Sequence, residues 1–200
     1  TTATNSFIDW MWKGGGAAVS NTSGTITSSV SANTIAGISI GTYTGTAVNA
    51  SVGHGLGVAP KMVITYSRSN GSGENKAVWH AGLTGGTYYV NLNSTAGQVN
   101  DSARFNGSPS STVFNIGANS QTNGSGYTFG FIAFAEVEGF SKIGSYAGNG
   151  SADGPCVWCG FRPRYILIKN TSTSLYWTIF DTARNTHNVA TLGLDPSTLY

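Results

Sequence analysis

The chain has 200 residues, enough for one large domain or two small ones. Charged residues make up only 9%, against about a quarter in ordinary globular proteins, whereas hydrophobic residues make up 40%, so a packed core rather than a disordered chain is expected. The net charge of +2 offers no basic patch for nucleic acid, and no apolar run reaches the roughly 20 residues of a membrane helix. A polar surface built mostly from Gly, Ser, Thr and Asn predicts an extracellular or virion-surface β protein, with no nucleic-acid or membrane partner.

A repeat organises the chain. A glycine-rich lead-in, a proline and an apolar run occur around Pro60 and again around Pro163, 103 residues later. Tyr43 and Tyr146, each in a short glycine-bounded motif, are separated by the same 103 residues. Two landmarks with one offset predict tandem copies of one β module, because a fixed period in sequence reflects a repeated structural unit.

In chain order, residues 1–13 resemble the end of the complete module in the spacing of their aromatic residues, and we interpret them as the final strand of a preceding module. Residues 14–36 are mainly Gly, Ser, Thr, Ala and Asn, a composition typical of a flexible connector. Thr25, Ile26 and Val30 are β-branched, which indicates that part of this connector lies along a sheet edge.

Residues 37–137 are interpreted as the complete module. Short stretches rich in β-branched or aromatic residues alternate there with Gly, Asn or Ser clusters, and they predict strands at 38–44, 48–53, 61–67, 76–82, 87–92, 111–117 and 126–137. About seven strands in about 100 residues is the spacing of a β-sandwich, of jelly-roll or immunoglobulin-like type.

Two of these strands carry informative patterns. In the fifth, Tyr88, Val90 and Leu92 alternate with Tyr89 and two asparagines, which predicts one buried and one wetter face. In the last, one face is expected to carry Tyr127, Phe129, Phe131, Ala133 and Ala135, and the other Ile132 and Phe134. A strand that is apolar on both faces lies in the middle of a sheet and is covered by two layers.

Residues 138–200 begin a second copy, with predicted strands at 165–169 and 177–181 that match 62–66 and 76–80. No counterpart of the 126–137 strand follows, so this copy is expected to be incomplete and to be completed by another chain or by residues outside this sequence. No helix is predicted anywhere, and residues 182–188 are expected to form one turn at most.

Several motifs resemble a repeat found in large structural proteins of tailed bacteriophages from marine and other environmental bacteria. They are GHGLGVAP at residues 53–60, AEVEGFSK at 135–142, GSYAGNGSADGP at 144–155 and FDTAR at 180–184. The resemblance implies an all-β module on a virion, in a receptor-contacting appendage such as a tail fibre. It assigns no catalytic or binding residue, and Cys156 and Cys159 depart from the pattern of the repeat.

Three residues are candidates for contact with a glycan. Trp158 follows a glycine-rich turn and is the tryptophan most expected to be exposed, whereas Trp10, Trp12, Trp79 and Trp177 lie in apolar runs typical of a core. Arg162 and Arg164 flank Pro163 and are expected on one face, where they would hold a sulfated or acidic glycan through bidentate contacts. The alternative for the arginines is a solvated edge that discourages pairing between sheets.

The remaining chemical motifs favour structural roles. Cys156 and Cys159 have metal or redox spacing, but one pair provides only half the ligands of a structural zinc, and buried small hydrophobic residues are the preferred interpretation. Whether the two cysteines pair stays open. Glu136 and Glu138 have the spacing of a glycosidase pair, yet they close a strand, where solvated carboxylates are ordinary.

His54, His80 and His187 are scattered, and a polar residue at a strand end is the expected role of His80. No metal or other cofactor is therefore expected. The sequence predicts a non-enzymatic virion structural protein, a tail-fibre module that adheres to host glycans and assembles as a homo-oligomer, trimeric by analogy, or with neighbouring virion proteins. The alternatives are a capsid decoration or head-fibre protein, a polysaccharide-degrading fibre, and a cellular carbohydrate-binding adhesin.

Overall fold

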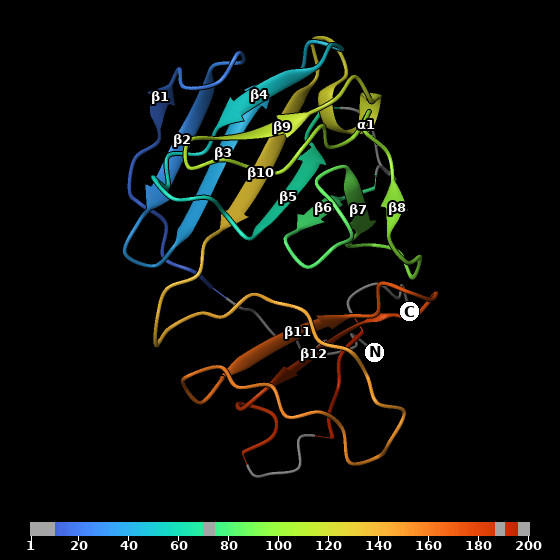
Figure 1. Cartoon of the computed structure of the whole chain (residues 1–200). Helices are drawn as coiled ribbons and strands as arrows, with labels where there is room; N and C mark the ends of the chain where they lie inside the picture. Colours follow the sequence, from blue (N-terminus) through green and yellow to red (C-terminus); the bar gives the residue numbers. More distant parts are fainter. Residues whose placement is uncertain (1–10, 70–74, 187–190, 196–200) are drawn as a thin grey trace, which may run out of the picture.

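The computed structural model describes residues 11–69, 75–186 and 191–195 (Figure 1). Short strands make up almost all of its regular structure, as the β-branched and aromatic content predicts. The elements are β1 (Val19–Asn21), β2 (Ser28–Asn33), β3 (Ile38–Thr44), β4 (Ala50–Gly53), β5 (Met62–Ser67), β6 (Ala77–His80), β7 (Tyr88–Asn91), β8 (Val99–Asn100), β9 (Val113–Ile116), α1 (Ser120–Asn123), β10 (Thr128–Phe134), β11 (Tyr165–Lys169) and β12 (Trp177–Asp181).

Eight of the strands form one antiparallel sheet in the order β1-β2-β3-β10-β5-β6-β7-β8. The two-stranded sheet β4–β9 lies across one face of it, and the β11–β12 hairpin lies below the sandwich in Figure 1. The layer formed by β4 and β9 is widened by bridges from Ile26 to Val52 and from Phe105 to Ile116. The molecule is therefore an all-β, sandwich-like fold.

The main core fills the space between the eight-stranded sheet and β4–β9. Tyr43 stacks on Phe129 with ring centroids 5.3 Å apart, and Phe114 of β9 meets Phe131 edge-on at 5.0 Å. Aromatic pairs in these offset and edge-on arrangements add to the free energy that burial alone provides. The hydroxyl of Tyr43 donates a hydrogen bond of 2.6 Å to the carbonyl of Thr122, so its polar end is satisfied inside the core.

β10 occupies the central position that its two apolar faces predict. Phe129, Phe131 and Ala133 are buried in the main core. Ile132 and Phe134, on the opposite face, pack in a second hydrophobic cluster beneath the β11–β12 hairpin. Two layers cover the strand, as predicted, but Tyr127 lies in the turn before β10 and is exposed, so its assignment to the core face was wrong.

All seven strands predicted between residues 37 and 137 are present, within a few residues of their predicted ends. The connector differs from the prediction. Its residues 19–21 and 28–33 form β1 and β2, and Ile26 and Val30 are buried, because alternating small apolar residues suffice for a strand that pairs with β3. The sheet edge is indeed formed there, by β1.

Two smaller elements were missed. The four-residue helix α1 contradicts the expectation of no helix; it begins after Asn119, whose side chain accepts a hydrogen bond from the backbone of Gln121, a standard helix cap. The two-residue strand β8 is too short to leave a pattern. Residues 1–10, which hold most of the predicted strand of a preceding module, lie outside the described residues, and residues 11–13 are not in a strand.

The hairpins of the two copies are structurally equivalent. β11 and β12 have the predicted bounds, and their register pairs Tyr165 with Asp181 and Leu167 with Ile179. These pairs correspond to Met62 with His80 and Ile64 with Val78 in β5 and β6. The sequence repeat therefore corresponds to a repeated hairpin in the same register.

The second hairpin packs on the outer face of the main sheet, opposite β4–β9. Leu167 and Trp177 join Ile64, Val78 and neighbouring residues in the second hydrophobic cluster. The indole Nε1–H of Trp177 donates a hydrogen bond of 2.8 Å to the carbonyl of Asn91, so the hairpin is also fixed by a polar contact. The two hairpins thus face each other through equivalent sides.

Candidate functional site

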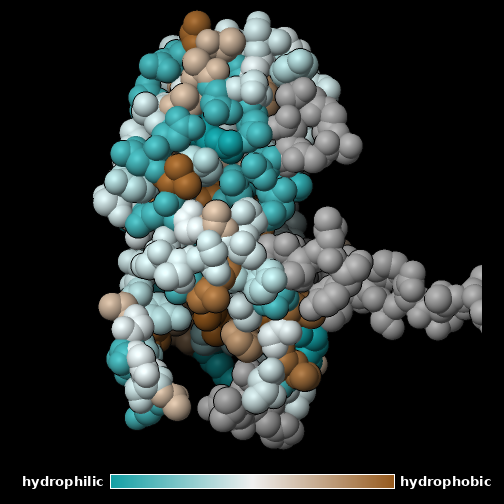
Figure 2. Space-filling view, turned by 90° about the vertical axis from the view of Figure 1, so that its right-hand side faces the viewer, coloured by the Kyte–Doolittle hydropathy of each residue, from teal (hydrophilic) through white to brown (hydrophobic). Residues whose placement is uncertain are grey.

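The predicted glycan-contact residues lie in the segment 144–163 and at Arg164, which joins this segment to β11. The segment contains no strand or helix, and most of its residues are exposed. Trp158 is 85% exposed, and Trp79 and Trp177 are buried, as predicted. The predicted core position of Trp12 was wrong, because this residue is 48% exposed, and Trp10 lies outside the described residues. Figure 2 shows hydrophobic residues gathered over the lower part of this side of the molecule, below the largely hydrophilic sandwich.

Arg162 and Arg164 are both exposed, and their guanidinium groups form no ion pair with an acidic residue that the structure describes. They precede β11 rather than lying on it, so strand alternation does not set their directions. The backbone carbonyl of Arg164 accepts a hydrogen bond of 3.0 Å from Thr182, which fixes the end of the segment against the β12 turn. The structure thus places Trp158 and both arginines in one exposed segment without bringing their side chains into contact.

The cysteines differ from the prediction. Cys156 is exposed and Cys159 is half-buried, and both are free thiols. By the 103-residue offset, Cys159 corresponds to Leu56, which is buried in the main core. Nothing equivalent to the β4–β9 layer covers the second copy among its described residues, and this explains why the cysteines are not core residues. No group of three His, Cys, Asp or Glu side chains gathers as metal ligands within the described ranges.

The carboxylate of Glu136 is fixed by two contacts with residues that follow it in the chain. Its Oε1 accepts a hydrogen bond of 2.8 Å from the backbone of Ile143 and lies 3.3 Å from Nζ of Lys142. These two contacts lower the pKa of the Glu136 carboxyl, although partial burial acts in the opposite direction. Glu138 is exposed on the tight turn that follows. The pair therefore lies in a turn beyond β10, and Glu136 stabilises that turn.

His54 and His80 have structural partners. The Nδ1 of His54 accepts a hydrogen bond from the backbone of Leu56, and its Nε2 lies 3.2 Å from the carbonyl of Ser110, an arrangement that fits the neutral ring. His80 ends β6, and its Nδ1 accepts a hydrogen bond of 2.9 Å from Gly82, as the strand-end role predicts. Burial lowers the pKa of both rings. His187 lies outside the described residues.

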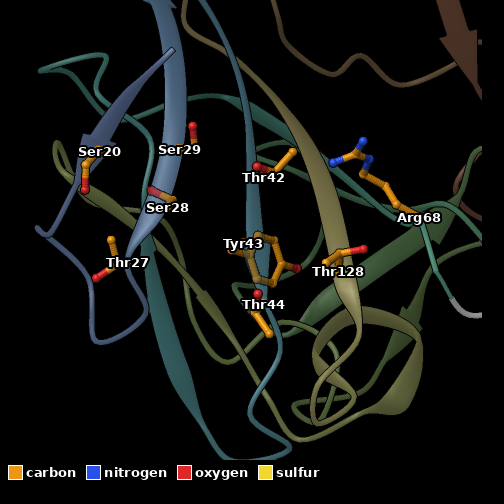
Figure 3. Close-up of a pocket in the computed structure, with 9 residues that line it drawn as sticks. All are labelled: Ser20, Thr27, Ser28, Ser29, Thr42, Tyr43, Thr44, Arg68 and Thr128. Atoms are coloured by element: carbon orange, nitrogen blue, oxygen red, sulfur yellow. The ribbon is translucent and has the colours of Figure 1, made fainter.

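A groove that the sequence did not predict lies on the outer face of the main sheet. Its volume is about 300 Å³ (Figure 3). Eight of its nine lining residues carry a hydroxyl group, and the ninth is an arginine. The hydroxyl groups of Ser28 and Tyr43 point to the core side, where they donate to the carbonyls of Gly53 and Thr122. The lining residues are Ser20, Thr27, Ser28, Ser29, Thr42, Tyr43, Thr44, Arg68 and Thr128.

Strand register explains why so many hydroxyl groups meet there. Ser20 pairs with Ser29, Ser29 pairs with Thr42, and Thr42 pairs with Gly130 in successive antiparallel ladders. Directly paired residues point to the same face, so their side chains form one row across the sheet. In the sequence these residues lie in four separate segments, and only the strand order brings them together.

These features define the class of the protein as all-β and sandwich-like, with few charged residues. No described helix is long and apolar enough to cross a membrane. A family model described as a domain of unknown function, DUF7483, matches residues 1–199, and the chain belongs to this family. Neither the curated proteins nor the solved structures gave a match. The family match spans the sandwich and the β11–β12 hairpin together.

Proposed function

We propose that this protein is a non-enzymatic structural and adhesive module of a bacteriophage virion, carried on a tail fibre or similar appendage and binding glycans of the host surface. The observation that carries the proposal is the exposed segment 144–163 with the adjoining Arg164, in which an indole that is 85% exposed precedes two exposed arginines. Aromatic faces stack on the apolar face of a sugar ring, and guanidinium groups bind carboxylate or sulfate through paired hydrogen bonds.

The rest of the molecule supports a mechanical role. Ten of its aromatic residues pack in the two hydrophobic clusters. The polar side chains of His54, His80 and Glu136 form hydrogen bonds that stabilise turns and strand ends. The motifs at residues 53–60 and 144–155 resemble phage structural repeats. A trimeric or other symmetric assembly would present several copies, and repetition raises the effective affinity of weak sites by large factors.

Binding to host cells tests the adhesive part of the proposal. Labelled protein is mixed with cells, and with purified surface polysaccharide, of the bacterium that the phage infects. Trp158→Ala is expected to lower binding at least fivefold, and Arg164→Gln to lower it less, whereas Lys61→Gln serves as a control exposed cation outside the segment. Binding that is absent, or unchanged in Trp158→Ala, contradicts the proposal.

Localisation and activity distinguish the alternatives. Antibody labelling of intact particles is expected to mark the tail; labelling of the capsid lattice instead would identify a decoration or head-fibre protein. Incubation with host polysaccharide is expected to release no new reducing ends. Release that is lost in Glu136→Gln would identify a polysaccharide-degrading fibre.

A further inference from the structure

We propose that the outer-face groove is a second saccharide site, which binds an anionic glycan lying across the strands of the main sheet. The inference rests on the proposed function in that it assigns a glycan as ligand, but it concerns residues far in sequence from segment 144–163. From the groove lining it uses the hydroxyl row Ser20–Ser29–Thr42 and the guanidinium of Arg68. The ring of Tyr66, which is not part of the lining, extends the site along the sheet.

The hydroxyl groups of the row are free to bind a ligand. The side chains of Ser20, Ser29, Thr42, Thr44 and Thr128 form no hydrogen bond with any residue in the described part of the chain. Adjacent strands are about 4.8 Å apart, so the row repeats at close to the length of one pyranose unit. A saccharide chain lying perpendicular to the strands would therefore meet an equivalent hydroxyl group at each step.

An aromatic surface continues the row. Gly130 pairs with Thr42 on one side and with Tyr66 on the other. A Cβ atom at Gly130 would lie 2.4 Å from Cζ of Tyr66, which means that the half-buried phenol ring leans over the glycine rather than standing away from the sheet. A ring in this position presents a face beside Thr42, which is the combination of an apolar platform and polar groups that sugars require.

Arg68 supplies the charge. It follows β5 directly, and its backbone N–H donates a hydrogen bond of 2.8 Å to Thr128, while the N–H of Thr128 bonds the hydroxyl of Ser69 at 2.9 Å. Figure 3 shows the Arg68 side chain extending over the sheet toward Thr42. It is the only charged residue of the lining, and no described acidic group lies within ion-pair distance of it. A carboxylate or sulfate on the sugar would provide the missing partner.

Calorimetric titration of the full chain with defined oligosaccharides tests the site. The probes are an oligogalacturonate, its neutral methyl ester and a sulfated oligosaccharide, so carboxylate and sulfate are examined separately. The wild-type protein is expected to bind at least one anionic probe at least tenfold more tightly than the neutral ester. Added salt is expected to weaken this binding, because the guanidinium is exposed.

The variants separate this site from segment 144–163. Arg68→Gln is expected to remove the preference for the anionic probe without affecting the fold, and Tyr66→Ala to lower the affinity for all three probes. These comparisons are made in a Trp158→Ala, Arg162→Gln, Arg164→Gln background, which removes the contribution of the other site. Lys61→Gln, which removes an exposed cation outside both sites, should leave the affinities unchanged. Failure of every probe to bind, or equal binding by Arg68→Gln, would overturn the groove site.

Cell binding keeps the two proposals distinguishable. Adhesion that depends on Trp158 while no probe binds the groove would leave the proposed function standing and refute only the second site. Probe binding that depends on Arg68, without any adhesion to host cells, would support the groove site and refute the proposed adhesive function. Thermal unfolding of Tyr66→Ala shows whether loss of the ring also destabilises the sheet around Gly130, and Arg68→Gln remains decisive if it does.

Discussion

The β5–β6 and β11–β12 hairpins have the same register but opposite surroundings. In the first, the face that carries Val63 and Trp79 lies under β4–β9, and Val63 is 0% exposed. In the second, the equivalent residues Ile166 and Phe180 face away from the sandwich, and Ile166 is 42% exposed. The other faces of the two hairpins pack together. Sequence similarity therefore specifies strand pairing, whereas burial depends on the layers that each copy receives.

The largest expected difference between the hairpins concerns their equivalent aromatic residues. Trp79→Ala should lower the free energy of unfolding by about 3–5 kcal/mol, because it leaves a cavity in the main core. Phe180→Ala should cost only about 1 kcal/mol, because the ring is half-buried and its surroundings can relax. Urea unfolding of both variants measures the two values. Equal losses would mean that a layer covers the second hairpin as β4–β9 covers the first.

Tyr43 and Tyr146, which precede the two hairpins at equivalent positions, are expected to show a smaller difference in their effect on stability. Tyr43 is 3% exposed and bonds the carbonyl of Thr122, whereas its repeat partner Tyr146 is 52% exposed. Tyr43→Phe should cost about 1–2 kcal/mol, because a buried carbonyl loses its donor. Tyr146→Phe should change stability by less than about 0.5 kcal/mol, as exposed substitutions usually do. Chemical denaturation decides, and a clear loss in Tyr146→Phe would show that the 144–163 segment is packed in solution.

The repeat also explains what the sequence could predict. Strands such as β3, β10 and β11 carry strong β-branched or aromatic patterns, and the apolar residues on both faces of β10 predicted that it lies between two layers. β2 was taken for a connector because serine and alanine dominate it, and its strand character comes from pairing with β3. The expected burial of Cys159 was wrong for a related reason: the residues that bury Leu56 in the first copy come from distant parts of the chain.

Of the two candidate sites, only the one at Trp158 could be predicted from the sequence. Exposure of Trp158 was predictable, because it follows a glycine-rich loop outside any periodic pattern. The groove was not, because Ser29, Thr42 and Arg68 are unremarkable in sequence and become neighbours only through the order β2-β3-β10-β5. A serine and threonine bias on alternate positions of several strands is the one signal that points to such a surface, and it acquires meaning only once the strand order is known.

The ends of β6 and β12 should respond to acid at different pH values. His80 and Asp181 are repeat partners, and each accepts a backbone hydrogen bond from the residue two positions later. Burial lowers the pKa of His80 below about 6.5, so the unfolded state binds the proton more tightly and stability falls as pH drops through about 6.5. Arg184 lowers the pKa of Asp181, so stability from this group persists until pH falls below about 4.

Unfolding midpoints between pH 8 and pH 3 measure these two steps. His54 contributes to the upper step in the same direction, because burial lowers its pKa as well. His80→Asn preserves an acceptor for Gly82 and should reduce the loss of stability between pH 7 and pH 5, while Asp181→Asn should reduce only the loss below about pH 4. A single acid step, unchanged in His80→Asn, would contradict the role assigned to this strand end.

The smallest expected effect is a difference in thiol reactivity between the two cysteines of segment 144–163. Cys156 is exposed and should react with a thiol reagent in the native protein, whereas Cys159 is half-buried with its thiol 3.6 Å from the carbonyl of Val157 and should react more slowly. Labelling followed by peptide mass spectrometry assigns each rate, and full denaturation provides the reference. The positions equivalent to these cysteines in the first copy, Gly53 and Leu56, are buried. Protection of both thiols would therefore show that a layer covers the second copy as well. The difference in burial between the two hairpins would then not hold for the protein in solution.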